Sequence, residues 1–241
     1  MKAKSINTCL FGLFLTLFFS SCSYLSNCVE GEGMVVEKEI QLENFQNLLL
    51  SNNVQVELSQ GAVQVVRMEA NENFFDLLNT EVVNGEWDVR FEQCVKKSGD
   101  IKLFIQVPTI AAINIKGSGD VKSIGKLNLD NLHLKINGSG DIDLELEANQ
   151  IETSINGSGN IQLLGSANDH TIKINGSGDL KAGKFLTVNT VIKTNGSGDA
   201  KLFASESLEI KINGSGDIDY SGNPKTMNSK INGSGKISQS N

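Results

Sequence analysis

The sequence predicts an all-β protein built as a single parallel β-helix, a solenoid whose coils take about 19 residues each. Two observations support this prediction. The tripeptide Gly-Ser-Gly recurs seven times, and apolar residues alternate with polar ones on both sides of each copy. A unit of strand, corner and strand as short as this cannot bury its apolar face alone, so we expect successive copies to stack.

The repeated corner has a fixed set of residues. The Gly-Ser-Gly copies begin at Gly117, Gly138, Gly157, Gly176, Gly196, Gly214 and Gly233, with spacings of 18 to 21 residues. Asn precedes six copies and Asp follows five. In three of the copies the expected structural corner residues are Asn137, Gly138, Ser139, Gly140, Asp141, Asn175, Gly176, Ser177, Gly178, Asp179, Asn213, Gly214, Ser215, Gly216 and Asp217. Glycine at such a corner permits a positive φ or a close approach of two backbones.

Apolar residues flank each corner at every second position, which is typical of strands with one buried face. Before the corner, the expected inward residues are Ile113, Ile115, Leu134, Ile136, Thr153, Ile155, Ile172, Ile174, Ile192, Thr194, Ile210, Ile212, Ser229 and Ile231. After it they are Val121, Ser123, Ile142, Leu144, Ile161, Leu163, Leu180, Ala182, Ala200, Leu202, Ile218, Tyr220, Ile237 and Gln239. Stacking at ~4.8 Å would set like residues in columns.

Two other repeat architectures fit less well. A β-propeller blade needs about 40 to 45 residues and four strands, which is more than twice this repeat. A calcium-binding β-roll repeats about every nine residues, and the units here have no second glycine-rich turn halfway round. The parallel β-helix is therefore the predicted architecture.

Residues 29–110 are expected to form degenerate first coils and a cap, and residues 111–241 the regular repeats of the same domain. Short strands are predicted at 34–42, 48–58, 63–69, 81–83, 86–91 and 102–107, with a helical turn at 73–79. Asn84-Gly85 predicts a hairpin turn. Residues 48–54 resemble a worn copy of the corner.

The N-terminal 22 residues have the pattern of an export signal. Lys2 and Lys4 precede an apolar stretch at 9–19, which is too short to span a bilayer, and Ser20, Ser21 and Cys22 follow. Cys22 is placed as in a bacterial lipobox, which predicts a signal peptide at 1–21, a lipid on Cys22 and a tether at 22–28. The alternative is an ordinary signal peptide that is cleaved near Ser21.

Four cysteines are present, and the signal accounts for two of them, Cys9 and Cys22. The remaining pair, Cys28 and Cys94, is expected to form a disulfide because the chain is exported. No histidine cluster lies near them, so we predict no metal site and no cofactor.

The run Lys135-Ile136-Asn137-Gly138-Ser139-Gly140-Asp141-Ile142, its recurrence, and the ending from Tyr220 to Ile237 resemble the GIN-domain family, described as putative auto-transporter adhesin head domains. The resemblance covers about residues 29–238. It implies a right-handed parallel β-helix on exported, often lipidated, proteins of Gram-negative bacteria. It carries over no catalytic residue.

Three columns of outward polar side chains are candidates for a binding site. The Asp column suggests either a row of cation sites or, as we favour, Asp side chains that accept hydrogen bonds from their own corners. The Asn column indicates structural amide stacking. Five lysines two positions before the Asn site form a stripe that could meet an anionic surface, but we interpret it as a solvated face with edge protection; these are Lys135, Lys173, Lys193, Lys211 and Lys230.

Composition argues against two classes of function. The formal charge is -7 with only two Arg, which does not fit a nucleic-acid-binding protein. An enzyme that acts on polysaccharides needs paired carboxylates or a base, and aromatic side chains that stack on sugars. The chain has one Trp, Trp87, and two Tyr, while His133 and His170 occupy unlike positions of their repeats. We therefore predict a protein that is not an enzyme.

The predicted function is that of a lipoprotein of the cell envelope, anchored in the outer membrane, whose repeated faces bind a glycan, a matrix component or another envelope protein. The alternatives are a spacer or periplasmic scaffold without a ligand and, less favoured, an enzyme on a β-helix. The last coil turns polar at Lys236 and Gln239, which predicts an end cap and a monomer.

Overall fold

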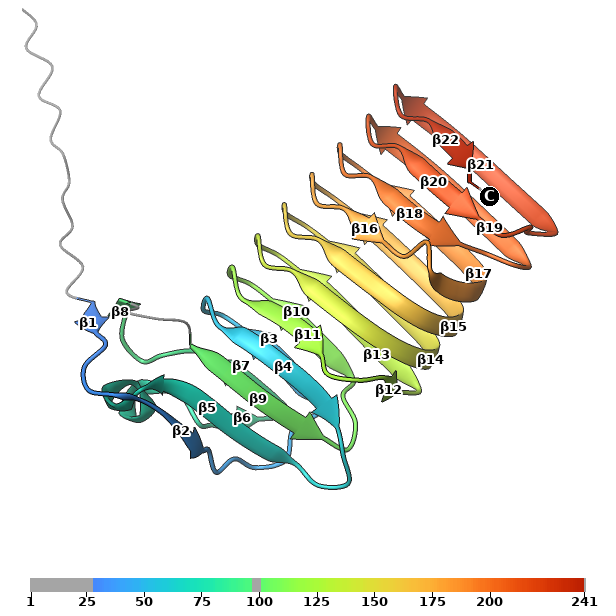
Figure 1. Cartoon of the computed structure of the whole chain (residues 1–241). Coiled ribbons are helices and arrows are strands. Elements are labelled where there is room, and N and C mark those ends of the chain that lie inside the picture. The colour runs from blue at the N-terminus through green and yellow to red at the C-terminus, as the bar shows by residue number, and fades with distance from the viewer. Residues whose placement is uncertain (1–27, 97–100, 241) are drawn as a thin grey trace, which may run out of the picture.

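The computed structural model describes residues 28–96 and 101–240 and shows a parallel β-solenoid, as predicted (Figure 1). Successive coils pair in parallel and in register, so that Ile136 lies beside Ile155, Ile155 beside Ile174 and Ile174 beside Thr194. The predicted signal peptide, Cys22 and most of the predicted tether lie outside the described residues.

The regular coils are formed by thirteen strands, each named here with its bounds. They are β10 (Ala112–Ile115), β11 (Asp120–Ser123), β12 (Leu127–Asn128), β13 (Asn131–Ile136), β14 (Ile142–Ile155), β15 (Ile161–Ile174), β16 (Leu180–Lys181), β17 (Phe185–Thr194), β18 (Ala200–Phe203), β19 (Ser207–Gly214), β20 (Ile218–Ser221), β21 (Thr226–Gly233) and β22 (Ile237–Gln239).

Each coil has two faces joined at the Gly-Ser-Gly corner. The strands that lead into the corner form what we call the first face, and the strands that leave it form the second face. The long strand β14 shows how the coil closes, since its residues 142–147 pair with β11 and β12 on the second face. Its residues 150–155 pair with β13 on the first face. Thus β14 passes from one coil into the next without a break.

The N-terminal part contains shorter elements close to the predicted positions. They are β1 (Val29–Glu30), β2 (Val35–Glu39), β3 (Asn47–Leu50), β4 (Gln55–Gln60), β5 (Val65–Asn71), the 3-10 helix η1 (Glu72–Leu77), β6 (Val82–Val83), β7 (Glu86–Val89), β8 (Val95–Lys96) and β9 (Lys102–Val107). The predicted turn at Asn84-Gly85 is present, with φ angles of 51° and 75°. Leu50 pairs with Ile115 and Gln55 with Asp120, so residues 51–54 do occupy a corner.

The order of the first coils in space differs from their order in sequence. The coil of β3 and β4 pairs on one side with β10 and β11 and on the other with β7 and β9 (Figure 1). The coil that comes second along the chain is therefore the outermost. Along the sequence, β5 comes between these two coils, and it pairs antiparallel with β9 on one side and with β2 on the other. The strand β5 therefore covers the edge of β9 that a simple solenoid would leave open, which is a common protection against edge-to-edge pairing.

The core consists of the predicted inward columns. In the coils between β10 and β20, the predicted positions are buried except for Ser123 and Tyr220, which are half-buried. In the last coil, Ser229 and Gln239 are exposed and Ile231 is 43% exposed, because no further coil among the described residues covers them. Two of the inward positions that are polar in sequence, Ser229 and Gln239, thus meet solvent at this end, together with the apolar Ile231.

One buried polar atom in the core has no partner. The hydroxyl of Thr194 is fully buried in the column of Ile174 and Ile212 and makes no hydrogen bond within the described residues. We expect Thr194→Val to raise the free energy of unfolding by about 1 kcal/mol, because it removes an unsatisfied hydroxyl without changing the shape of the side chain. Urea titration measures the change.

Thr153 provides the matched control for that substitution. Its hydroxyl is equally buried but lies 2.9 Å from Nε2 of His170. We expect Thr153→Val to lower stability, since it leaves the ring nitrogen unpaired. If the two variants shift stability in the same direction, hydrogen bonding does not decide the effect.

Candidate functional site

Close packing of the coils requires the glycines of the corner, and among them Gly214 and Gly233 also have a positive φ, of 157° and 149°. From Gly138 onward, a Cβ placed on any Gly-Ser-Gly glycine would lie 1.9 to 2.3 Å from a carbonyl oxygen of the preceding coil. At the first copy, Gly117 and Gly119 face the non-glycine corner at Ser51 and Asn52 and have more room, 3.3 and 2.7 Å. Of the two explanations that the sequence left open, close approach therefore applies to nearly every corner.

We expect Gly140→Ala to destabilise the protein by about 3 kcal/mol or more, because its Cβ would lie 1.9 Å from the carbonyl oxygen of Gly119. Backbone must move to admit it. Gly183→Ala is the matched control, since its Cβ would meet nothing closer than 3.6 Å. Thermal unfolding of the two variants tests the argument, and equal melting temperatures would contradict it.

The Asn residues before the corner form a continuous amide ladder. Nδ2 of Asn156 donates to Oδ1 of Asn137 at 3.0 Å, and Asn175 donates to Asn156 at 2.8 Å. The ladder continues through Asn195, Asn213 and Asn232 at 2.7 to 2.9 Å. The predicted amide stacking is thus present, and it links the coils on the solvent side of the corner.

The Asp column forms a second ladder, and its hydrogen bonds differ from those we favoured. Oδ1 of Asp120 accepts from the backbone N–H of Asp141 at 2.9 Å, and Oδ1 of Asp199 accepts from that of Asp217 at 2.7 Å. The donor belongs to the next coil and not to the same corner, so the expected Asx-type bond is wrong. The reason is stacking, which places the next N–H directly over the carboxylate. Asn160 takes the same role without a charge.

The lysine stripe lies on the outside of the first face, as predicted. Lys173 reaches Oε1 of Glu152 at 3.0 Å, and His133 Nδ1 lies 3.3 Å from the same carboxylate. The hydrogen bond from Lys173 lowers the pKa of Glu152. Opposite charges are interspersed on this face, which is typical of a solvated sheet surface.

His170 is a histidine, a residue type common in active sites, but here it belongs to the core. It is fully buried in β15, bonded to Thr153, and its ring packs edge-on against Phe185 with centroids 5.6 Å apart. Burial lowers its pKa from 6.5 to about 3, so the ring is neutral in the folded protein. It faces the core and is not available to a ligand.

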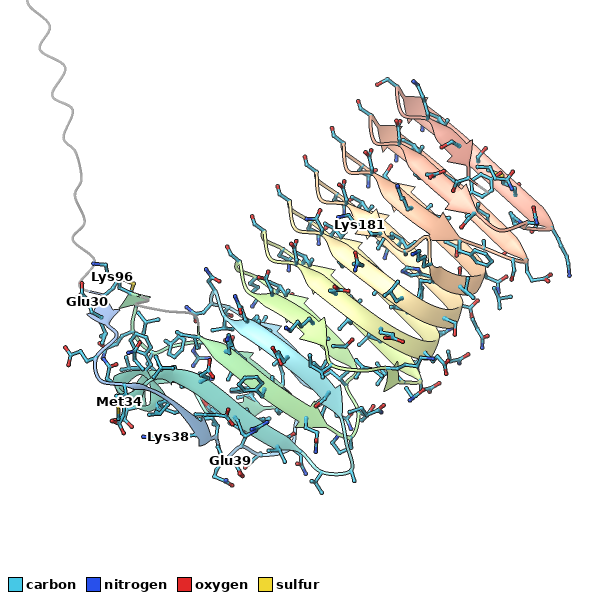
Figure 2. All side chains as sticks on the ribbon, in the orientation of Figure 1. Glu30, Met34, Lys38, Glu39, Lys96 and Lys181 are labelled. Atoms are coloured by element: carbon cyan, nitrogen blue, oxygen red, sulfur yellow. A yellow bond between two sulfur atoms is a disulfide. The ribbon has the colours of Figure 1, made fainter. Side chains whose placement is uncertain are left out.

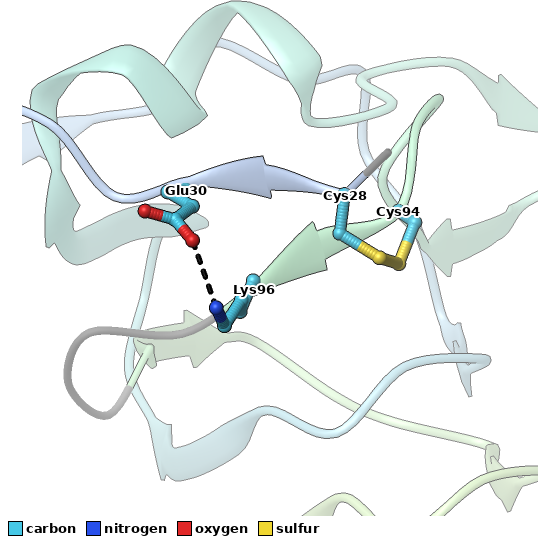
Figure 3. Close-up of a disulfide and its surroundings, with 4 residues drawn as sticks. All are labelled: Cys28, Glu30, Cys94 and Lys96. Atoms are coloured by element: carbon cyan, nitrogen blue, oxygen red, sulfur yellow. Dashed lines mark hydrogen bonds and ion pairs between the residues drawn. A yellow bond between two sulfur atoms is a disulfide. The ribbon is translucent and has the colours of Figure 1, made fainter. Parts of the chain in front are cut away.

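A disulfide between Cys28 and Cys94 ties the start of the described chain to the cap (Figure 3). The short strands β1 and β8 pair beside it, and Lys96 Nζ lies 2.8 Å from Oε1 of Glu30. This ion pair raises the pKa of Lys96 and lowers that of Glu30. The predicted cysteine pair is therefore confirmed.

Within residues 28–96 and 101–240, the structure shows no side-chain cluster of the kind that binds a metal ion. No three His, Cys, Asp or Glu side chains lie close enough to hold a metal ion, and no helix is long and apolar enough to cross a membrane. Trp87 is buried, and its Nε1–H donates to the carbonyl of Asn79 at 3.0 Å, so its ring cannot stack on a sugar. What the fold offers to solvent is its two long faces.

These features define a parallel β-solenoid with a repeated Asn-Gly-Ser-Gly corner. The chain belongs to the family described as "Putative auto-transporter adhesin, head GIN domain", whose profile matches residues 44–224. The comparison with curated proteins finds no match.

Solved structures support the same fold. A putative adhesin from Bacteroides fragilis superposes with a TM-score of 0.83 at 22% identity, covering 88% of this chain and all of the other. A putative lipid binding protein from Parabacteroides distasonis gives 0.73 at 21% identity over 88% and 99% of the two chains. A putative adhesin from Parabacteroides merdae gives 0.70 at 20% identity over 88% and 99%. At these identities the likeness establishes the fold.

Proposed function

We propose that the protein is a non-enzymatic lipoprotein of the cell envelope whose solenoid faces bind a glycan, a matrix component or another envelope protein. The observation that carries the proposal is the long, regular outer surface of the stacked coils, which solenoids commonly use for binding. Membership of an adhesin-head family and the adhesin names of related structures support it. The Asn and Asp ladders contribute to rigidity, so a partner would meet a preformed surface.

The proposed anchor is a lipid on Cys22 in the outer membrane. The strands β1 and β8, which lie beside the Cys28–Cys94 disulfide, are at one end of the solenoid, while β22 is at the opposite end (Figure 1). An anchor at Cys22 would therefore leave the regular coils extending away from the bilayer. Mass spectrometry of the mature protein tests this part, and an unmodified N-terminus at Cys22 would refute it.

Two experiments test the binding function. Proteolysis of intact cells, with an internal periplasmic protein as control, determines whether the solenoid is on the surface. A glycan and matrix-protein array with the purified protein then tests for a partner. We expect binding on the array and reduced adhesion when the gene is deleted.

The competing functions give different results. A spacer or scaffold predicts that gene deletion leaves adhesion and glycan binding unchanged. Turnover of a polysaccharide by the purified protein, abolished by one point substitution, would establish an enzyme instead.

A further inference from the structure

We propose that Lys181, Lys184 and Lys201 on the second face form a binding site for an acidic polysaccharide. This inference rests on the proposed binding function and names the chemistry of its partner. The three side chains line one open concavity of about 410 Å³ together with Gln162 and Leu164, and no acidic residue lines it. In a chain with a formal charge of -7, a purely basic concavity is a local reversal of the general charge.

The three lysines come together because of the register of the coils. Lys181 in β16 pairs directly with Lys201 in β18, so their side chains leave neighbouring strands on the same face. Lys184 lies in the turn that joins β16 to β17. The side chain of Lys181 is labelled on its coil in Figure 2. Two like charges on directly paired residues repel each other, and a bound anion would relieve that repulsion.

All three lysines are exposed, and none of them forms an ion pair within the described residues. Other lysines of the protein do, for example Lys122 with Glu57 at 3.0 Å and Lys126 with Glu147 at 2.8 Å. The nearest carboxylate in register is Asp219 beside Lys201, and its Oδ1 accepts from Ser238 at 3.2 Å. Because Gln162 and Lys201 flank Lys181, Asp219 is the one carboxylate of the described chain in register with the cluster, which keeps a net positive charge.

The turn adds two backbone donors to the cluster. The N–H of Phe185 donates to the carbonyl of Ala182 at 3.1 Å and closes the turn. The N–H groups of Gly183 and Lys184, within the turn, make no hydrogen bond in the part of the chain that is described. Free N–H groups in a turn beside lysines are a common arrangement for binding carboxylate or sulfate oxygens.

The choice of a sugar polymer over other polyanions follows from the rest of the surface. Leu164, 37% exposed, provides an apolar patch for the C–H face of a sugar ring. No Trp, Tyr or Arg lines the concavity, so the stacking platform that single-stranded nucleic acids use is missing there. Lys181 and Lys201 leave adjacent strands at the spacing of ~4.8 Å, which suits two neighbouring anionic groups of one chain.

The test compares two triple variants of the full mature protein that lose the same charge. Lys181→Gln, Lys184→Gln and Lys201→Gln remove the proposed site, whereas Lys135→Gln, Lys193→Gln and Lys211→Gln remove lysines from the first face. The probes are polygalacturonate, heparin, a DNA oligonucleotide and neutral dextran, and their binding is measured by calorimetry at low and physiological salt. Circular dichroism and melting curves verify that both variants fold.

We expect the parent to bind an anionic probe but not dextran, and the site variant to lose about tenfold or more in affinity while the first-face variant changes by about twofold or less. Stronger binding of polygalacturonate would assign a carboxylated glycan and stronger binding of heparin a sulfated one.

Equal losses in the two variants, no binding of either anionic probe, or tighter binding of a DNA oligonucleotide would overturn the proposal. A partner found on the array that binds the site variant and the parent alike would refute this site and leave the proposed function standing.

Discussion

Replacing Ile174 with aspartate is expected to lower the free energy of unfolding by more than about 5 kcal/mol, enough to unfold a domain of ordinary stability. Ile174 is fully buried between Ile155 and Thr194 of the neighbouring coils. Aspartate would remove the packing of the isoleucine side chain on both sides. It would also place a carboxyl group where no donor of the ladder can reach it.

Thr171→Asp is the matched control, since it introduces the same charge in the same strand, β15, at an exposed outward position. We expect this variant to melt within a few degrees of the parent. Guanidinium titration followed by circular dichroism compares the three proteins. If the Ile174 variant unfolds at the parental midpoint, the assignment of the inward column is wrong.

The regular coils could be predicted from the sequence because one residue pattern determines three structural features at once. The alternation around Ile172 and Ile174 identifies the buried face, and Gly176 and Gly178 mark the corner. The constant spacing then sets the register. In a parallel stack each position meets its own equivalent, so one repeat describes its neighbours. The amide ladder through Asn156 and Asn175 follows from the same argument.

The N-terminal coils could be predicted only as separate elements. Strands near β3, β4, β7 and β9 were expected, but their order in the stack depends on the antiparallel pairing of β5 with β9 and β2. No repeated motif marks that pairing, because residues 61–100 contain no complete Gly-Ser-Gly copy.

Side-chain chemistry was predictable where a column repeats and not where a residue is unique. The acceptor role of the Asp column was expected, but its donor in the next coil required the actual spacing of the coils. The cluster of Lys181, Lys184 and Lys201 depends on a turn that the repeat does not describe. The alternation did indicate the burial of His170, which lies two positions before Ile172 and in register with Ile151, but its hydrogen bond to Thr153 had no sequence signal.

His170 should make the stability of the protein depend on pH between about 6.5 and about 3. Desolvation by complete burial lowers its pKa to about 3, whereas in the unfolded chain the ring titrates near its ordinary value of 6.5. Between these two values the unfolded state binds more protons than the folded state. The free energy of unfolding therefore falls as pH falls through this range, by about 2 kcal/mol between pH 7 and pH 5 from this residue alone.

His170→Gln isolates this contribution, because glutamine retains a hydrogen-bonding group near Thr153 but does not titrate. We expect the variant to lose stability between pH 7 and pH 5 by about 2 kcal/mol less than the parent, whatever its stability at neutral pH. His133→Gln is the control for the substitution itself, since it makes the same replacement at a histidine that lies on the surface beside Glu152. Urea titrations at several pH values measure the three dependences. If the stability of the parent and of the His170 variant depends on pH in the same way, the ring is not buried as a neutral group. Water would then reach the interior of the stack at β15.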